Sequence, residues 1–163
     1  YSQLKHSEIM ELNEFCISLL KRLDPQNIVI VGDPIHCSTS ETIEFTQHAK
    51  DMGADLVSLI VREKYFTDAQ ILDHFAQVGN VTNMAILVHE MPFLSGFNGT
   101  QMHWPKSLMM SLPKIPHIIA LKEDAKETTP YCEFRGGRFV RCVNAGSILI
   151  HPNGYPVFLL TRS

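Results

Sequence analysis

Short apolar segments alternate along this chain with longer amphipathic ones. Four of the apolar segments, at residues 27–32, 55–61, 84–89 and 117–122, are bounded by glycine, proline or polar residues. Nearly continuous apolar runs of this length are typical of strands whose two faces are both buried, as in a parallel sheet. We therefore expect four successive strands of one parallel sheet.

The amphipathic segments between them predict helices. Ser7 is expected to cap a first helix that Asp24-Pro25 ends, with one apolar stripe formed by Ile9, Leu12, Cys16, Leu19, Leu20 and Leu23. Ser38 and Glu41 form a capping-box pattern for a second helix, which Gly53 ends. Residues 67–78 and 105–112 are the third and fourth predicted helices.

Strands that alternate with helices specify parallel β-α units with right-handed crossovers. Two further apolar segments, 138–144 and 155–161, give six predicted strands within 163 residues, which we treat as a single domain, 1–163. A complete (β/α)8 barrel needs roughly 200 residues or more. The predicted fold class is therefore an α/β TIM barrel that is incomplete, and the alternative is an open, doubly wound sheet of the flavodoxin type.

Composition excludes several kinds of partner. A net charge of -3 gives no electrostatic reason to expect nucleic acid or an acidic membrane surface. No apolar run approaches the roughly 18 residues that span a bilayer, and the first residues do not have the pattern of a signal peptide. We expect a cytoplasmic protein whose cysteines, at positions 16, 37, 132 and 142, are free thiols.

A metal site is not expected. The eight histidines are scattered and form no His-Glu-x-x-His pattern, and none stands at zinc-finger spacing from a cysteine. The chain also lacks the glycine-rich fingerprints of dinucleotide and phosphate sites. No cofactor is therefore predicted.

Lys122 ends the apolar segment His117-Ile118-Ile119-Ala120-Leu121. The carboxyl ends of parallel strands are where α/β folds open onto a pocket. Burial favours the neutral form of an amine, and a neutral amine is a nucleophile toward a carbonyl group. A solvated lysine at a strand end is the plainer interpretation of this segment taken alone.

This chain resembles the family of dihydrodipicolinate synthase and N-acetylneuraminate lyase, which are Schiff-base-forming (β/α)8 barrels. The resemblance lies in several motifs and in their order and spacing along the chain. The resemblance runs from Tyr1 to about Lys126. It rests on Ile30-Val31-Gly32, Ser40-Glu41-Thr42-Ile43-Glu44, Ala49-Lys50-Asp51-Met52-Gly53-Ala54-Asp55, His89-Glu90-Met91-Pro92 with Gly96, and Ile119-Ala120-Leu121-Lys122-Glu123.

The resemblance implies catalytic residues. Lys122 matches the family lysine that forms an imine with pyruvate or another 2-oxo acid, so no separate cofactor is implied. His89 stands where the family has the tyrosine of a Tyr-Asn-x-Pro pattern, which relays protons to the imine. Tyr65 lies near a second family tyrosine, although the preceding proline is absent; a packed aromatic is the other interpretation of Tyr65.

The resemblance also implies substrate contacts. Asn144, Ala145 and Gly146 match a region that lines the other side of the substrate. The family's Gly-x-x-Gly-(Thr/Ser)-Glu loop, which grips the keto-acid carboxylate, would precede the first helix, and this sequence does not contain it. We therefore expect a barrel without its first two strands.

Two functions follow as alternatives. The first is a lyase or aldolase that joins Lys122 to a 2-oxo acid and then forms or cleaves a C–C bond. The second is a catalytically impaired homologue that acts as a binding or scaffold protein. The resemblance also implies a homo-oligomer, and an aromatic loop with Phe93, Leu94, Phe97 and Trp104 is a candidate subunit contact or pocket wall.

Overall fold

The computed structural model describes residues 4–32, 38–60, 67–90 and 104–123. Four strands form one sheet in the order β1-β2-β3-β4, and every neighbouring pair is parallel. Their bounds are β1 Ile30–Gly32, β2 Leu56–Ile60, β3 Ala85–Glu90 and β4 Ile118–Glu123. This confirms the four expected strands, whereas predicted strands 138–144 and 155–161 lie outside the described residues.

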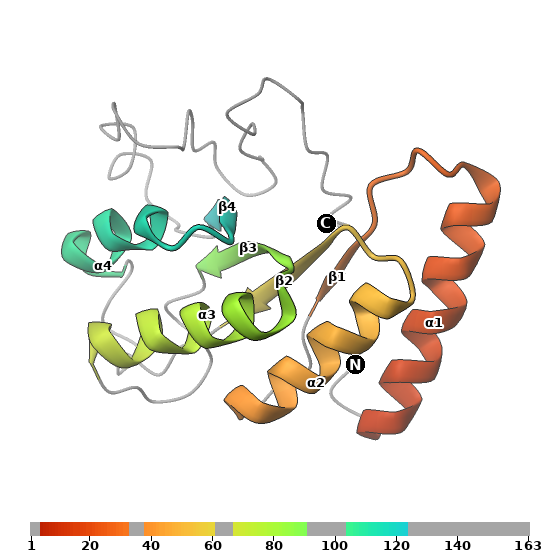
Figure 1. Cartoon of the computed structure of the whole chain (residues 1–163), viewed down its shortest axis with the longest axis horizontal. Coiled ribbons are helices and arrows are strands. Elements are labelled where there is room, and N and C mark those ends of the chain that lie inside the picture. Colours follow the sequence, from red (N-terminus) through yellow and green to blue (C-terminus); the bar gives the residue numbers. More distant parts are fainter. Residues whose placement is uncertain (1–3, 33–37, 61–66, 91–103, 124–163) are drawn as a thin grey trace.

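Helices follow one another around one side of this sheet (Figure 1). Their bounds are α1 His6–Leu23, α2 Thr39–Asp51, α3 Asp68–Thr82 and α4 Lys106–Ser111, and a short 3-10 helix covers Leu112–Lys114. Within the described ranges, no helix combines the length and the apolar character needed to cross a bilayer.

The ends of α2 and α3 follow local rules. Ser38 caps α2 as predicted: its hydroxyl accepts from the Glu41 N–H, and its own N–H donates to Glu41 Oε2 at 2.8 Å. The Ser38 N–H, and the Ser38 hydroxyl that donates to the same Glu41 Oε2 at 2.7 Å, lower the pKa of Glu41 because they stabilise its ionised form. Gly53, which follows α2, has a φ of +94°, a conformation that favours glycine. Helix α3 runs past the predicted end at residue 78 to Thr82, and Asn83 is its C-cap, with a φ of 49°.

Helix α1 corrects two predictions. Its N-cap is Lys5, not Ser7, because the Lys5 N–H donates to Glu8 Oε2 at 2.7 Å and the helix begins at His6. Its buried residues are Ile9, Asn13 and Ile17. The predicted stripe is only partly right, since Leu12, Cys16, Leu20 and Leu23 are exposed.

The sheet separates two apolar clusters. The larger one lies between strands and helices and includes Val57, Val88 and Leu121 together with Phe45 and Phe75. The smaller one contains strand residues alone, with Leu56, Leu87 and Ala120 at its centre. Because side chains alternate along a strand, these clusters mark the helix-covered face and the opposite face, which we call the inner face.

Trp104 joins the larger cluster, which corrects its assignment to a subunit contact or pocket wall. It is 2% exposed, and its ring lies 6.5 Å from that of Phe75 on α3. A large aromatic ring gains more by filling the space between α3 and α4 than by remaining in a loop. The other three residues of that predicted contact, at positions 93, 94 and 97, lie outside the described residues.

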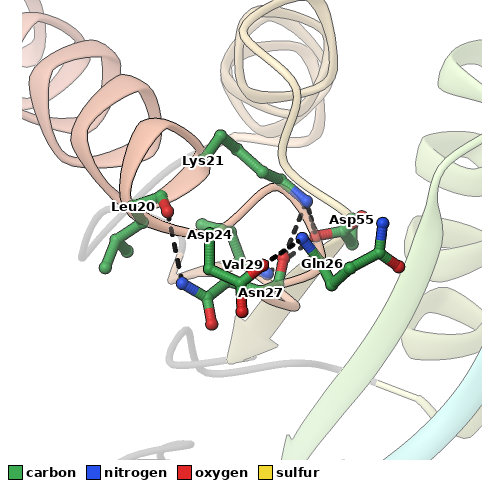
Figure 2. A network of polar contacts seen from close by, with 7 residues as sticks. All are labelled: Leu20, Lys21, Asp24, Gln26, Asn27, Val29 and Asp55. Carbon is green, nitrogen blue, oxygen red and sulfur yellow. Dashed lines mark hydrogen bonds and ion pairs between the residues drawn. The ribbon is translucent and has the colours of Figure 1, made fainter.

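A network of polar contacts lies at the amino-terminal ends of β1 and β2 (Figure 2). Asp55 Oδ2 accepts from the Lys21 Nζ and from the Val29 N–H, both at 2.7 Å. Lys21 Nζ also donates to the Asn27 carbonyl at 2.7 Å. The network therefore ties α1 and the segment before β1 to the residue that precedes β2.

Candidate active site

Lys122 and His89 both project from the inner face of the sheet. Val88 and Leu121, one residue before each of them, belong to the helix-covered cluster, whereas Leu87 and Ala120, two residues before, belong to the inner cluster. Alternation along β3 and β4 thus puts both polar side chains on the inner face, near the carboxyl ends of their strands. The position near the carboxyl end of a strand is the one that the sequence predicted for Lys122.

A β-bulge in β4 sets this placement. Ile86 pairs with Ile118, but the next residue of β3, Leu87, pairs with Ala120, so Ile119 is an extra residue on β4. An extra residue reverses which side chains face which side of a sheet. If Ile119 paired with Leu87 in a regular ladder, Leu121 would turn to the inner face and Lys122 toward the helices.

After the bulge, Lys122 is the direct register partner of His89, and Lys122 Nζ lies 2.9 Å from His89 Nε2. His89 is 8% exposed, and Lys122 is partly buried. A protonated amine and a protonated imidazole would present only donors to each other at this distance. The contact therefore fits a pair that holds at most one positive charge, with one nitrogen donating and the other accepting.

Among the described residues, the neighbours of the pair on the inner face of the sheet are apolar. Leu87 and Ala120 lie one inward-facing position back along the two strands, and Ile60 of β2 is the register partner of His89 on its other side. The arrangement therefore holds an amine and an imidazole in contact beside apolar side chains.

Four of the predicted site residues are not placed. Tyr65 and the segment Asn144, Ala145 and Gly146 lie outside the described residues. Within the described ranges, no group of three or more His, Cys, Asp or Glu side chains gathers as metal ligands would. The described part of the candidate site is thus the Lys122–His89 pair and its apolar wall.

Relatives share this arrangement of strands and helices. One solved structure is that of a prophage protein of the dihydrodipicolinic acid synthase family from E. coli K12, in complex with pyruvate. It aligns with this chain with a TM-score of 0.66 and 26% sequence identity. The alignment covers 78% of this chain and 40% of the prophage protein. N-acetylneuraminate lyase from Fusobacterium nucleatum, also solved with pyruvate, aligns with a TM-score of 0.62 and 20% sequence identity. That alignment covers 77% of this chain and 40% of the lyase, and at this identity it shows a likeness of fold. The described residues are therefore part of a (β/α)8 barrel.

Sequence comparison finds relatives of the same kind as the structural comparison. The 4-hydroxy-tetrahydrodipicolinate synthase of Alkaliphilus oremlandii is 27% identical over 133 residues, which cover 79% of this chain and 43% of the relative. The chain thus matches less than half the length of that curated relative. The profile of the dihydrodipicolinate synthetase family matches residues 3–136, more than half of this chain. The chain belongs to the dihydrodipicolinate synthetase family.

Proposed function

We propose that this protein is a class I aldolase-type lyase that condenses Lys122 with pyruvate or a related 2-oxo acid. The observation that carries the proposal is the 2.9 Å contact between Lys122 Nζ and His89 Nε2 on an apolar inner face. Membership of the family and the pyruvate bound in two solved relatives support the substrate class.

The proposed first step is imine formation. The neutral Lys122 amine adds to the keto carbon as the C=O π pair moves to oxygen, and a C–N bond forms. His89 Nε2 takes one proton from the nitrogen and delivers it to that oxygen, and solvent supplies the second proton. Water then leaves with the C–O bonding pair, and the nitrogen lone pair closes the C=N bond of a protonated imine.

The imine then acts as the electron sink. Its positive nitrogen allows the adjacent carbon to lose a proton to a base, for which His89 is our candidate, and the resulting enamine adds to an aldehyde. The reverse sequence cleaves a C–C bond. We propose Tyr65 as a further proton relay, and Asn144, Ala145 and Gly146 as backbone contacts for the bound acid; no cofactor beyond the lysine imine is required.

The test is reductive trapping. The protein is incubated with pyruvate and borohydride, and the intact mass and tryptic peptides are measured. We expect one irreversible adduct on the peptide that contains Lys122. The adduct should disappear in Lys122→Ala and persist in Lys114→Ala, a matched change at an exposed lysine four residues before β4.

Absence of an adduct with several 2-oxo acids would contradict the proposal. An adduct that forms equally in Lys122→Ala would also contradict it, because another amine would then be the nucleophile. Trapping reports condensation alone, so aldehyde turnover is assayed separately.

A catalytically impaired binding protein is the second candidate. The histidine at position 89, where the family has a tyrosine, favours it. This candidate predicts that pyruvate binds, as measured by calorimetry, without a trapped adduct or aldehyde turnover.

A further inference from the structure

Helix α3 contains a buried glycine, Gly79, before its C-cap Asn83. Glycine is the least favourable residue of a helix after proline, because it gives up the most backbone freedom on folding. A buried helical glycine is therefore expected where another segment approaches too closely for a side chain to fit between them.

The segment that approaches Gly79 is the residue before β4, His117. A Cβ built on Gly79 would lie 2.6 Å from His117 Cβ and 2.7 Å from the Cγ and Cδ2 of its ring. Carbon atoms in contact stay about 3.5–4.0 Å apart. Turning the imidazole to another rotamer does not relieve the clash, because the Cβ is fixed to the backbone. A side chain at position 79 therefore requires one of the two backbones to move by about 1 Å.

We expect the start of β4 to move, because α3 is held more firmly. Near the middle of α3, His74 Nδ1 lies 2.9 Å from Thr39 Oγ1 of α2. At its end, the Thr82 carbonyl accepts from Lys50 Nζ of α2 at 2.7 Å. Strand β4 instead follows a short 3-10 helix and a turn, and among the described strands it pairs with β3 alone.

The start of β4 is also where its pairing with β3 begins. The Ile86 N–H donates to the His117 carbonyl at 2.8 Å, and Ile86 pairs with Ile118 immediately before the bulge. Beyond the bulge, the strand brings Lys122 to its pairing with His89. Most side chains of β4 up to that point are buried, and close-packed segments transmit a displacement.

We propose that Gly79 is a positioning residue for the Lys122–His89 pair. The absent Cβ lets the start of β4 lie against α3, and this contact fixes where the strand holds the Lys122 amine, five residues or about 16 Å further along. Gly79 acts through His117 and not on the reacting groups themselves. The consequence for catalysis rests on the proposed imine chemistry, whereas the placement of the pair can be measured without it.

The first test observes the pair directly, at one pH, by ¹⁵N NMR of the histidine rings in the full chain. The His89 signals are assigned by their loss in His89→Gln, and Lys122→Ala shows where they lie without the contact. In Gly79→Ala, the Nε2 signal should move most of the way to its position in Lys122→Ala. Val78→Ala is the matched control: Val78 is 0% exposed on α3, so its truncation disturbs the same helix without pushing on β4, and the signal should stay at its parent position.

The second test is the rate of borohydride-trapped adduct at saturating pyruvate. Gly79→Ala should form the adduct at least tenfold more slowly, since a displacement of about 1 Å can cost up to 100-fold in rate. Adding His117→Gly moves the Cβ from one side of the contact to the other and should restore most of the rate. Adding His117→Ala leaves both Cβ atoms in place and should restore less. Urea unfolding of each variant, compared with Val78→Ala, separates this effect from a general loss of stability.

A folded Gly79→Ala with the parent's His89 signal and the parent's adduct rate would overturn the proposal, because the clash would then be absorbed before it reached Lys122. If Gly79→Ala does not fold, His117→Gly alone tests the same contact from the β4 side, and an unchanged His89 signal in that variant would also overturn the proposal. A parent protein that forms no adduct contradicts the proposed function instead, and the His89 signal still decides the role of Gly79.

Discussion

At the scale of single residues, the contact between Lys122 and His89 combines two requirements of imine chemistry. The attacking nitrogen must give up a proton as the C–N bond forms, and the departing oxygen must receive one. A neutral imidazole both accepts and donates a proton near neutral pH, whereas a tyrosine hydroxyl does so at a much higher pKa. A histidine at this position is therefore compatible with the chemistry, with a different dependence on pH.

This argument predicts the effect of His89→Gln. The amide can still hydrogen-bond to Lys122 but cannot carry a proton, so imine formation should slow by roughly 100-fold. The measurement is the rate of trapped adduct at saturating pyruvate as a function of pH, on a variant whose unfolding transition matches the parent. His89→Tyr should retain more activity than His89→Gln at high pH. An unchanged rate in His89→Gln would show that His89 does not transfer the proton.

Single residues were predicted from the sequence with mixed success. Ser38 and Asp24-Pro25 act locally, through a cap and a break, and both predictions are confirmed. Ser7 and Trp104 were predicted wrongly because their roles depend on partners that sequence spacing does not reveal. Glu8 satisfies the Lys5 N–H, and Phe75 receives the indole ring.

At the scale of elements, β4 shows where sequence patterns lose information. Its residues Ile118, Ile119, Ala120 and Leu121 are all apolar, so no alternation indicates which of them faces the helices. Register pairing and packing with β3 decide this through the bulge at Ile119. The sequence therefore predicted that Lys122 ends a strand, but it did not predict the bulge that turns Lys122 to the inner face.

The bulge predicts that deleting Ile119 preserves the trapped adduct, whereas inserting an alanine between Ala120 and Leu121 abolishes it. The deletion removes the extra residue, so Ala120 follows Ile118 directly and Lys122 still pairs with His89 on the inner face. The insertion moves Lys122 one register position further along β3 and turns its side chain toward the helix-covered face. Peptide mass after borohydride reports both variants, and far-UV circular dichroism checks that each is folded. A folded insertion variant with a normal adduct on Lys122 would contradict the role of the register.

Helix α1 is a second case at this scale. Periodicity predicted its position and length, but the apolar residues extend over more of its circumference than α2 and the sheet cover. A sequence pattern that contains two apolar rows does not state which row is buried. The neighbouring elements bury Ile9, Asn13 and Ile17. Other apolar side chains of the helix, such as Phe15 and Leu23, remain exposed.

At the scale of the molecule, we propose separate tasks for the two ends of the parallel strands. The Lys122–His89 pair lies at the carboxyl ends, and the network around Asp55 lies at the amino-terminal ends. In (β/α)8 barrels the carboxyl ends carry the chemistry, and the opposite end contributes to stability. The order of strands and helices was predictable because consecutive β-α units pair in chain order, whereas these long-range polar contacts were not.

This division predicts that Asp55→Ala lowers the stability of the fold without changing the rate of imine formation. Removing the carboxylate deprives the partly buried Val29 N–H of its acceptor and Lys21 of its ion pair, which should lower the free energy of unfolding by about 1–3 kcal/mol. Urea unfolding measures this change, and the rate of adduct formation under native conditions should match the parent. Asp73→Asn is the control: Asp73 accepts a surface hydrogen bond from Gln77 Nε2 at 2.6 Å on α3, so its change should cost less than about 0.5 kcal/mol. If Asp55→Ala slowed the condensation as strongly as His89→Gln while leaving stability intact, the two ends would not act independently, and the Asp55 network would belong to the catalytic apparatus.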